Sequence, residues 1–329
     1  MAVISYLEGI RQGIWEEMER DPSVFCIGED IGVYGGAFKI TQGMLDRFGP
    51  NRVVDTPIAE SGIVGAAIGA SFTGLRPVAE MQFSDFISCA FDQIVNFAAK
   101  CRYRWGAPVP IVIRAPSGGG IHGGPYHSQN PEAWFVHTPG LKVIEPSSAY
   151  DAKGLIKSAI RDNDPVIFFE HKALYRRIKD EVPEGNYTVP IGKAKTVRAS
   201  DAHQKHQISV ITYGAMVYVA LEAALTLDRE GISLEIIDLR TLLPIDEDAV
   251  LTSVKKTAKV IVLHEASLTG GIGGEIAARI GEKAFEYLDG PVIRIAAPDT
   301  PVPFAPPLEE AFLPNAQKLI EKARWLAKY

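Results

Sequence analysis

The sequence predicts an α/β protein with two doubly wound domains, each built on a mainly parallel sheet. Short β-branched runs alternate with longer segments of helical periodicity along the chain, a pattern typical of strand–helix–strand units. The length of 329 residues is more than one hydrophobic core usually serves. With 47% apolar and 22% charged residues, the chain has a globular composition that can fill two cores.

The β-branched runs form two series separated by a polar stretch. The first series predicts strands at 24–27, 52–54, 78–81, 109–113, 142–144 and 166–169. The second series predicts strands at 208–212, 234–237, 260–263 and 292–295. The polar stretch contains Pro183, Gly185 and Asn186, which favour loops. We therefore expect a first domain at 1–186, a linker at 187–206 and a second domain at 207–329.

Charge and hydropathy argue against two classes of partner. The formal net charge is −6, from 34 basic and 40 acidic residues that are dispersed along the chain, which is unlike a nucleic-acid-binding or membrane-binding surface. The uncharged helical stretch 61–75 is shorter than the ~20 apolar residues of a membrane span. Cys26, Cys89 and Cys101 lie in apolar patterns and are expected to be reduced core thiols of a cytoplasmic protein. The expected partners are proteins and small molecules.

Several segments with unusual polar residues follow the strands of the first series. Glu29 follows the first strand, Glu60 the second, and the segment 82–86 the third. A glycine-rich loop at 117–129 follows the fourth. Open α/β sheets bind ligands beyond the carboxyl ends of their strands, so these segments are expected to converge on one edge.

Glu60 is the only charged residue in a long apolar neighbourhood. We expect a helix with Thr56 as N-cap and Pro57 at its first position, packed internally through small residues. A capping box would place the cap at Pro57, which has no side-chain oxygen, and a helix-dipole role weakens beyond the first turn. A structural role is the alternative. Burial in apolar surroundings would raise the pKa of this carboxyl, which favours proton chemistry.

The glycine-rich loop carries His122 and His127. Its five glycines within seven positions permit close approach of the backbone to a ligand. Proton transfer or anion recognition by His127 is the favoured interpretation. The alternatives are a metal site that also uses His137, and an exposed loop without a function.

Two further motifs are weaker signals. The glycine-rich segment 270–275 is similar to a phosphate-binding turn, but lacks the acidic partner of a dinucleotide site. We expect it to serve close helix packing or a subunit contact. Phe86 is near enough to a strand end to reach a ligand ring, whereas Phe91 is expected to be a core residue.

Six motifs occur in a fixed order along the chain. They are Gly28-Glu29-Asp30, Asp55-Thr56-Pro57-Ile58-Ala59-Glu60, Met81-Gln82-Phe83-Ser84-Asp85-Phe86, Tyr126-His127-Ser128-Gln129, Pro139-Gly140-Leu141-Lys142-Val143 and Ile237-Asp238-Leu239-Arg240. Together they resemble the beta subunit of thiamine-diphosphate-dependent 2-oxo acid dehydrogenases over essentially the whole chain. The resemblance implies a pyrimidine-binding domain followed by a transketolase-type C-terminal domain.

The resemblance implies a role for each candidate site residue. Glu60 would hydrogen-bond to N1′ of the aminopyrimidine and so activate the cofactor, and Phe86 would contact the pyrimidine at a position where relatives often carry tyrosine. His127 would face the substrate and assist acyl transfer to lipoamide. Glu29 and Asp92 would belong to an acidic proton relay between paired cofactors.

The resemblance also implies that Mg²⁺, and in some relatives K⁺, is bound. Family members hold Mg²⁺ and the diphosphate with a Gly-Asp-Gly motif followed by paired asparagines, and this chain has neither. The chain would thus carry half a site for thiamine diphosphate and need an alpha subunit, in an α2β2 heterotetramer. Some relatives bind structural potassium through matching carbonyls, although several have Asn at the last of these positions. The carbonyls belong to Ile111, Ala159, Ile160, Asp162 and Asp164.

Within the family, the segments 126–133 and 168–176 are most similar to branched-chain (2-oxoisovalerate) dehydrogenases. The implied reaction is oxidative decarboxylation of 3-methyl-2-oxobutanoate, with acyl transfer to the lipoamide of an acyltransferase core that binds the C-terminal domain. A pyruvate or acetoin dehydrogenase subunit is the alternative substrate class. A transketolase-type transferase half and a noncatalytic scaffold that docks through 306–329 are the alternative functions.

Overall fold

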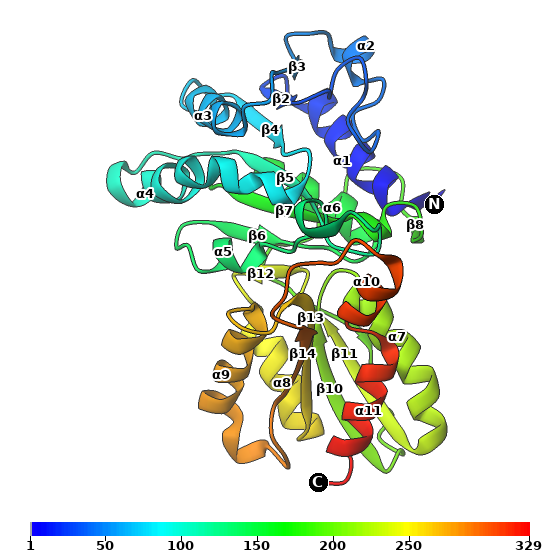
Figure 1. Ribbon diagram of the computed structural model, residues 1–329. Coiled ribbons are helices and arrows are strands. Elements are labelled where there is room, and N and C mark those ends of the chain that lie inside the picture. The colour runs from blue at the N-terminus through cyan, green and yellow to red at the C-terminus, as the bar shows by residue number, and fades with distance from the viewer. Residues whose placement is uncertain (1) are drawn as a thin grey trace. The chain divides into compact units, whose positions relative to one another are not determined.

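The computed structural model describes residues 2–329, which form two compact units (Figure 1). The first unit contains the chain up to Gly118 together with Trp134–Ile191. The second contains Gly119–Ala133 and Gly192–Tyr329. The last division, between Ile191 and Gly192, falls inside the stretch expected to be the linker. The glycine-rich loop belongs to the second unit, although the strand before it belongs to the first.

The first unit is built on a parallel sheet with the strand order β6-β7-β5-β4-β2-β3. All six runs of the first series are strands, as predicted. Two short strands missed by the sequence analysis, β1 (Ala2–Ser5) and β8 (Lys179–Val182), form a separate antiparallel pair. The parallel strands are β2 (Val24–Gly28), β3 (Val53–Asp55), β4 (Arg76–Glu80), β5 (Val112–Ser117), β6 (Lys142–Ile144) and β7 (Val166–His171).

Helices cover both faces of the first sheet (Figure 1). On one side, α1 (Tyr6–Arg20) packs along α6 (Ala149–Arg161). On the other side lie α3 (Glu60–Ser71) and α4 (Ala99–Trp105). Between β4 and α4 the chain forms a 3₁₀ helix and then a π-helix, and shorter helices complete the unit. These are Ser84–Ala90, Gln93–Ala98, α2 (Met44–Phe48), the 3₁₀ turn Lys172–Leu174 and the part of α5 (Glu132–Val136) from Trp134 on, whereas the 3₁₀ turn Gly124–Tyr126 lies in the second unit.

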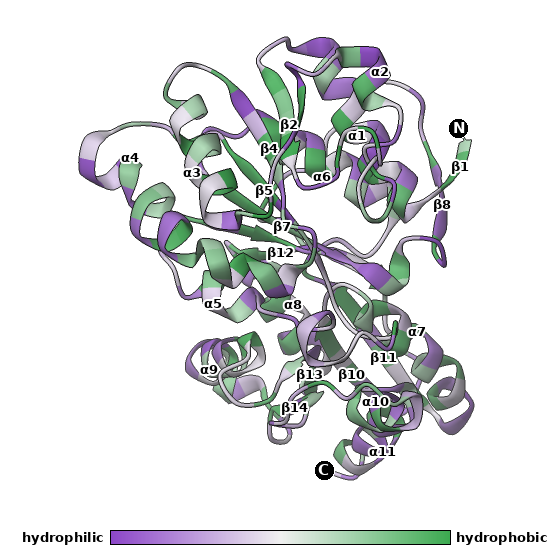
Figure 2. Cartoon of the chain, turned by 45° about the horizontal axis from the view of Figure 1, so that its top comes forward, coloured by the Kyte–Doolittle hydropathy of each residue, from purple (hydrophilic) through white to green (hydrophobic). Residues whose placement is uncertain are grey.

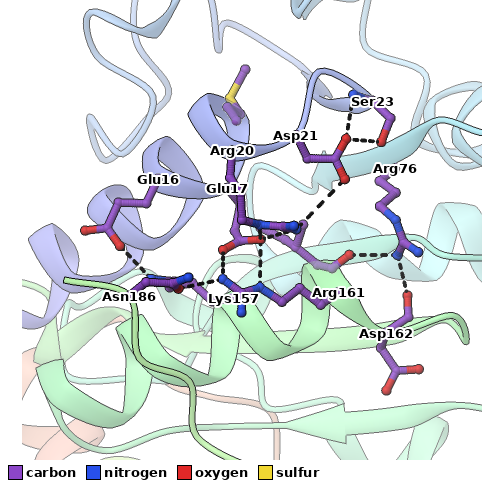
Figure 3. Close-up of polar contacts among 12 residues, drawn as sticks. Glu16, Glu17, Arg20, Asp21, Ser23, Arg76, Lys157, Arg161, Asp162 and Asn186 are labelled. Carbon is purple, nitrogen blue, oxygen red and sulfur yellow. Dashed lines mark hydrogen bonds and ion pairs between the residues drawn. The ribbon is translucent and has the colours of Figure 1, made fainter.

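The contact between α1 and α6 combines close backbone approach with ion pairs (Figure 3). A Cβ on Gly9 would come within 2.6 Å of the Ala149 carbonyl oxygen, so only glycine allows this spacing. Buried Glu17 accepts hydrogen bonds from Arg161 at 2.6 and 3.0 Å, and half-buried Glu16 pairs with Lys157 at 2.6 Å. The helices are therefore held in one register by paired charges.

The second unit is built on a sheet with the strand order β14-β13-β10-β11-β9. All of its strands are parallel except β9, which pairs with β11 in the antiparallel direction. The four predicted runs are strands; β9 was missed because its sequence, Lys-Thr-Val-Arg, is mostly polar. The strands are β9 (Lys195–Arg198), β10 (His206–Thr212), β11 (Ile232–Asp238), β13 (Val260–Ser267) and β14 (Ile293–Ala297).

Helices also cover both faces of the second sheet (Figure 1). One face carries α7 (Met216–Leu227) and α11 (Ala316–Leu326), and the other carries α8 (Glu247–Thr257) and α9 (Ile272–Ala284). Figure 2 shows β10 and β13 in the green of hydrophobic residues. The prediction of two doubly wound, mainly parallel domains is confirmed. The remaining elements are β12 (Thr241–Leu243), α10 (Pro306–Phe312) and the 3₁₀ turns Asp228–Glu230 and Phe285–Tyr287.

Three local predictions need correction. The helix that carries Glu60 begins at Glu60 itself, with Ala59 at the N-cap, because Thr56 makes no side-chain cap. This helix is exposed on one side, at Ser61, Gly62 and Ala66 among others, so it is not internal within the chain. Cys89 is exposed, whereas Cys26 and Cys101 are buried as predicted.

Two further expectations concern the role of the segment 270–275 and the presence of membrane-spanning helices. A Cβ on Gly273, at the start of α9, would come within 2.6 Å of the His264 ring. The segment 270–275 therefore serves close packing of α9 on β13, one of its two expected roles. Within residues 2–329, no helix combines the length and hydrophobicity that crossing a bilayer requires.

Candidate active site

The strand order of the first unit creates a switch point between β2 and β4. From β2 the chain continues to β3 on one side of it, and β4 then pairs on the other side. Ligands of doubly wound sheets bind at such switch points, beyond the carboxyl ends of the strands. Glu29 directly follows β2, and Met81 directly follows β4. The fold thus places two of the predicted segments at the expected binding edge.

Glu29 and Glu60 are brought together at this edge. Both are buried, with 5% and 9% of their surface exposed. Burial and then the negative charge of Glu60 raise the pKa of Glu29. Oε1 of Glu29 has no hydrogen-bond partner within residues 2–329. Two buried carboxyls with an unused oxygen form a site that can hold and transfer a proton.

Glu60 owes part of its environment to the helix that it begins. As the first residue of α3, it lies where helical N–H groups have no internal partner and the helix dipole is positive. The dipole stabilises its carboxylate, in contrast to the weak effect expected from a helix that starts at Pro57. In neighbouring Glu29, burial favours the protonated carboxyl.

Aromatic side chains lie on the segment after β4. The Phe83 and Phe86 rings meet edge to face with their centroids 6.2 Å apart, and Phe38 meets Phe83 in the same way at 5.4 Å. Phe86 is only partly buried. A flat, partly exposed ring at this edge of the sheet suits a heteroaromatic ligand.

A fully buried charge cluster lies behind this edge. The Arg114 guanidinium on β5 bonds to Glu80 on β4 and to both oxygens of Glu170 on β7, at 2.6 and 2.8 Å. The Tyr175 hydroxyl donates to Glu170 at 2.6 Å. Burial raises the pKa of Glu80 even though Arg114 opposes it. The cluster ties together β4, β5 and β7, of which β4 leads to the segment with Phe83 and Phe86. Sequence reasoning missed it because its members are 34 and 56 residues apart.

Asp92 and Phe91 do not join the Glu29–Glu60 pair by any described contact. Asp92 is exposed and accepts a hydrogen bond from Asn96 at 2.7 Å along the same helical segment. Phe91 is 38% exposed, although its ring lies 5.8 Å from buried Phe135. The proton relay through Asp92 stays a prediction.

Two of the five predicted potassium ligands contact the guanidinium group of Arg76 (Arg76 and Asp162 in Figure 3). Nη1 of Arg76 donates to the carbonyl oxygens of Ile160 and Asp162 at 3.0 and 2.8 Å. The carbonyls of Ile111 and Ala159 accept hydrogen bonds from backbone N–H groups. A potassium ion would have to share two of its five oxygens with a positive charge. This arrangement fits the cation poorly, and the potassium site stays a prediction.

The loop with His127 lies in the second unit and is attached by buried carboxylates. Glu265, at the end of β13, accepts hydrogen bonds from the Gly119 N–H at 2.7 Å and from Asn130 Nδ2 at 2.9 Å. Glu309, on α10, accepts from two further backbone N–H groups of the loop. His127 itself is partly exposed. The fold therefore presents His127 on a loop whose backbone is fixed.

A second group of buried ionisable residues lies next to this loop. Tyr213 donates to Glu132 at 2.5 Å, and the other carboxylate oxygen of Glu132 has no hydrogen-bond partner within residues 2–329. Burial raises the pKa of Glu132 to about 7. His264 stacks on Tyr213 with ring centroids 6.4 Å apart, and burial lowers its pKa to about 4.

The histidines of the loop do not form a metal centre. Nδ1 of His122 lies 2.6 Å from Glu309, and no group of three His, Cys, Asp or Glu side chains suited to a metal occurs in residues 2–329. Glu265, Glu309 and Glu132 were missed as site residues by the sequence analysis. Only Glu265 carried a signal, because it lies two residues after a predicted strand.

Two doubly wound domains, with buried carboxyls at the switch point of the first, define a thiamine-enzyme type of architecture, and comparison with known proteins agrees. The transketolase pyrimidine-binding domain family matches residues 2–178, and the transketolase C-terminal domain family matches 194–319. A solved split-gene transketolase, described as an inactive β4 tetramer, superposes with a TM-score of 0.80. It covers 99% of this chain and 98% of its own, at 23% identity, and so shows a shared fold.

More similar relatives identify the family. The 2-oxoisovalerate dehydrogenase subunit beta of Bacillus subtilis (strain 168) is 50% identical over the full length of both chains. The pyruvate dehydrogenase E1 component subunit beta of the same organism is 44% identical, again over both full lengths. That of Staphylococcus epidermidis (strain RP62A) is 44% identical over 98% of each chain. The chain belongs to the family of beta subunits of thiamine-diphosphate-dependent 2-oxo acid dehydrogenases.

Proposed function

We propose that the chain is the beta subunit of a branched-chain 2-oxo acid dehydrogenase that decarboxylates 3-methyl-2-oxobutanoate. The observation that carries the proposal is the buried Glu29–Glu60 pair at the switch point, in a chain that is 50% identical over its full length to a 2-oxoisovalerate dehydrogenase subunit. Pyruvate is the second candidate substrate, because the pyruvate dehydrogenase relatives are 44% identical.

The residues at the switch point suit the pyrimidine end of thiamine diphosphate. When bound, this cofactor supplies the nucleophilic carbon and the electron sink that decarboxylation requires. Glu60 would hydrogen-bond to the pyrimidine nitrogen, and Phe86 would lie against the ring. Glu29, whose pKa is raised by burial and by the charge of Glu60, would keep a proton available in the acidic relay that Asp92 extends. The unused oxygen of Glu29 supports this role.

The other half of the site would come from a partner. Because the chain lacks the Gly-Asp-Gly motif, an alpha subunit would bind the diphosphate and Mg²⁺, in an α2β2 heterotetramer. His127 would face the substrate and assist transfer of the acyl group to lipoamide on an acyltransferase core, which would bind the C-terminal domain. We propose a cytoplasmic location. Structural potassium stays outside the proposed mechanism because Arg76 occupies two of its carbonyl ligands.

The substrate is tested with the chain reconstituted with its alpha subunit. Steady-state rates with lipoyl domain as acceptor are compared for 3-methyl-2-oxobutanoate, pyruvate and acetoin. The proposal expects the highest kcat/KM for the branched substrate. A preference for pyruvate would establish the second candidate instead. Activity only with an aldehyde acceptor would indicate a transketolase-type transferase, and no turnover with any substrate would favour a docking scaffold.

The role of Glu60 is tested with Glu60→Gln in the same complex. Loss of an acid–base group that acts on the cofactor should lower turnover by about 10²-fold or more. Glu282→Gln makes the same change on the exposed surface of α9 and should leave turnover within about twofold. Unchanged turnover in the Glu60 variant would rule out the proposed activation of the cofactor.

A further inference from the structure

The loop 119–133 is attached to the rest of the second unit by an unusual concentration of carboxylate acceptors (α10 and β13 in Figure 1). Glu309 is 1% exposed and uses both oxygens for this loop alone. Its Oε1 accepts from the Gly120 N–H at 3.1 Å, and its Oε2 accepts from the His122 N–H at 3.1 Å. Nδ1 of His122 lies 2.6 Å from the same Oε2. Hydrogen bonds to a charged acceptor are about twice as strong as neutral ones.

The local backbone is shaped for these bonds. His122 has a φ of +59°, a left-handed conformation that is uncommon for residues other than glycine, although Asn, Asp and His adopt it more often than the rest. This conformation accompanies the contacts of both its N–H and its imidazole with Glu309. Gly124 has a φ of +67°, and a Cβ there would come within 2.3 Å of the Phe304 ring. Both the aromatic ring and the carboxylate come from the segment 302–313.

Carboxylates hold the loop on both sides of His127. Glu309 holds the loop on the N-terminal side of His127, at residues 120–122. Glu265 holds Gly119 and, beyond His127, Asn130. Without these carboxylates, the glycine-rich backbone would have several N–H groups without acceptors and large conformational freedom. A loop with four glycines cannot fix a side chain by its own preferences.

We propose that Glu309 is a positioning residue for acyl transfer, which holds the His127 loop through the three contacts with Gly120 and His122. The inference rests on the proposed function, since it uses the role of His127 in that reaction. Under this proposal the segment 302–313 contributes to acyl transfer, and this contribution is separate from docking of the acyltransferase core. Glu309 touches neither substrate nor cofactor and acts only through the loop. Its loss should therefore affect the step that uses His127 more than the decarboxylation step.

The test compares Glu309→Gln with Glu310→Gln, its exposed neighbour on the same helix. The amide has one acceptor oxygen, so the Glu309 variant cannot keep all three contacts. In the reconstituted complex, we expect kcat for acylation of lipoyl domain to fall by about tenfold or more. Decarboxylation measured with 2,6-dichlorophenolindophenol should stay within about twofold. Glu310→Gln should change neither rate.

A second experiment measures the protection of the loop backbone in the absence of turnover. Hydrogen–deuterium exchange of the purified chain should speed up in peptides covering 119–133 for Glu309→Gln and not for Glu310→Gln. Unchanged exchange, or equal loss of both partial reactions, would overturn the proposal. Failure of the wild-type complex with every 2-oxo acid would instead reject the proposed function.

If Glu309→Gln does not fold, His122→Asn replaces it. Asparagine tolerates the left-handed conformation and keeps the backbone N–H, but it removes the imidazole–carboxylate contact. The same selective loss of lipoyl acylation is expected, at about threefold, because two of the three contacts remain. Equal rates for His122→Asn and the wild type in both partial reactions would contradict the proposal.

Discussion

The two units each bury a group of ionisable side chains, and the groups differ in how completely they are paired. In the first unit, Arg114 lies between Glu80 and Glu170, so both carboxylates meet the guanidinium. In the second unit, one oxygen of Glu132 and both ring nitrogens of His264 have no hydrogen-bond partner within residues 2–329. The paired group links neighbouring strands. In the unpaired group, burial raises the pKa of Glu132 to about 7 and lowers the pKa of His264 to about 4.

The largest effect should come from breaking the paired group. Arg114→Met leaves two carboxylates buried without their counter-ion, which should lower the free energy of unfolding by about 3–5 kcal/mol. Urea unfolding followed by circular dichroism measures the change. Arg47→Met removes an exposed ion pair with Glu19 and should cost less than about 1 kcal/mol. Equal costs for the two variants would mean that the Arg114 cluster contributes no more than a surface pair.

Glu132→Gln should change how stability depends on pH. The folded-state pKa of about 7 lies above the unfolded value near 4.5, so the folded protein favours the protonated carboxyl. The wild type therefore loses stability as the pH rises from 4.5 through 7, by roughly 2–3 kcal/mol relative to the glutamine variant. Unfolding curves at pH 5 and pH 8 measure the difference, with Glu310→Gln as the exposed control. The raised pKa would be contradicted if the gain in free energy of unfolding of Glu132→Gln over the wild type were no larger at pH 8 than at pH 5.

His264→Leu should have a smaller effect at neutral pH. Because both nitrogens lack partners, their removal sacrifices no hydrogen bond, and the free energy of unfolding at pH 7 should change by less than about 1 kcal/mol. The lowered pKa has the opposite sign to that of Glu132: the wild type loses stability as the pH falls from 6.5 toward 4. The variant should lack this loss. Strong destabilisation at pH 7 would show that the imidazole has a polar contact that the variant removes.

The smallest effect concerns potassium. With Arg76 on two of the five predicted carbonyls, replacing NaCl by KCl at equal ionic strength should stabilise the chain by less than about 1 kcal/mol. Thermal unfolding in the two salts measures the difference. Arg76→Gln frees the oxygens and should make the difference larger. A strong preference for K⁺ in the wild type would mean that the cation and Arg76 share these carbonyls.

The sequence predicted the elements that periodicity and β-branched residues define. Every predicted strand is present, because these runs are buried on both faces of parallel sheets. The start of α3 was wrong, because Thr56 and Pro57 form a valid capping sequence that the chain does not use. Short edge strands such as β9 were missed because pairing with a neighbour, and not their own composition, makes them strands.

Some residues of the candidate site could also be predicted from the sequence, and others could not. Glu29 and Glu60 could be predicted, because each follows a strand and their sheet edge is fixed by topology. Glu309 could not be predicted, because its partners Gly120 and His122 lie 189 and 187 residues away. Nothing local distinguishes it from exposed Glu310 beside it. A long-range contact of this kind is a property of the packed chain and leaves no pattern in a short window.

The path of the chain has a consequence for its synthesis. Residues 119–133 leave the ribosome long before β13 and α10, which carry their carboxylate partners. Most of the first unit can therefore begin to fold while the histidine loop still lacks its acceptors. The loop would acquire its final conformation only after α10 has been made and has emerged from the ribosome. A nascent chain that stalls before α10 would thus display an ordered first unit beside an unanchored loop.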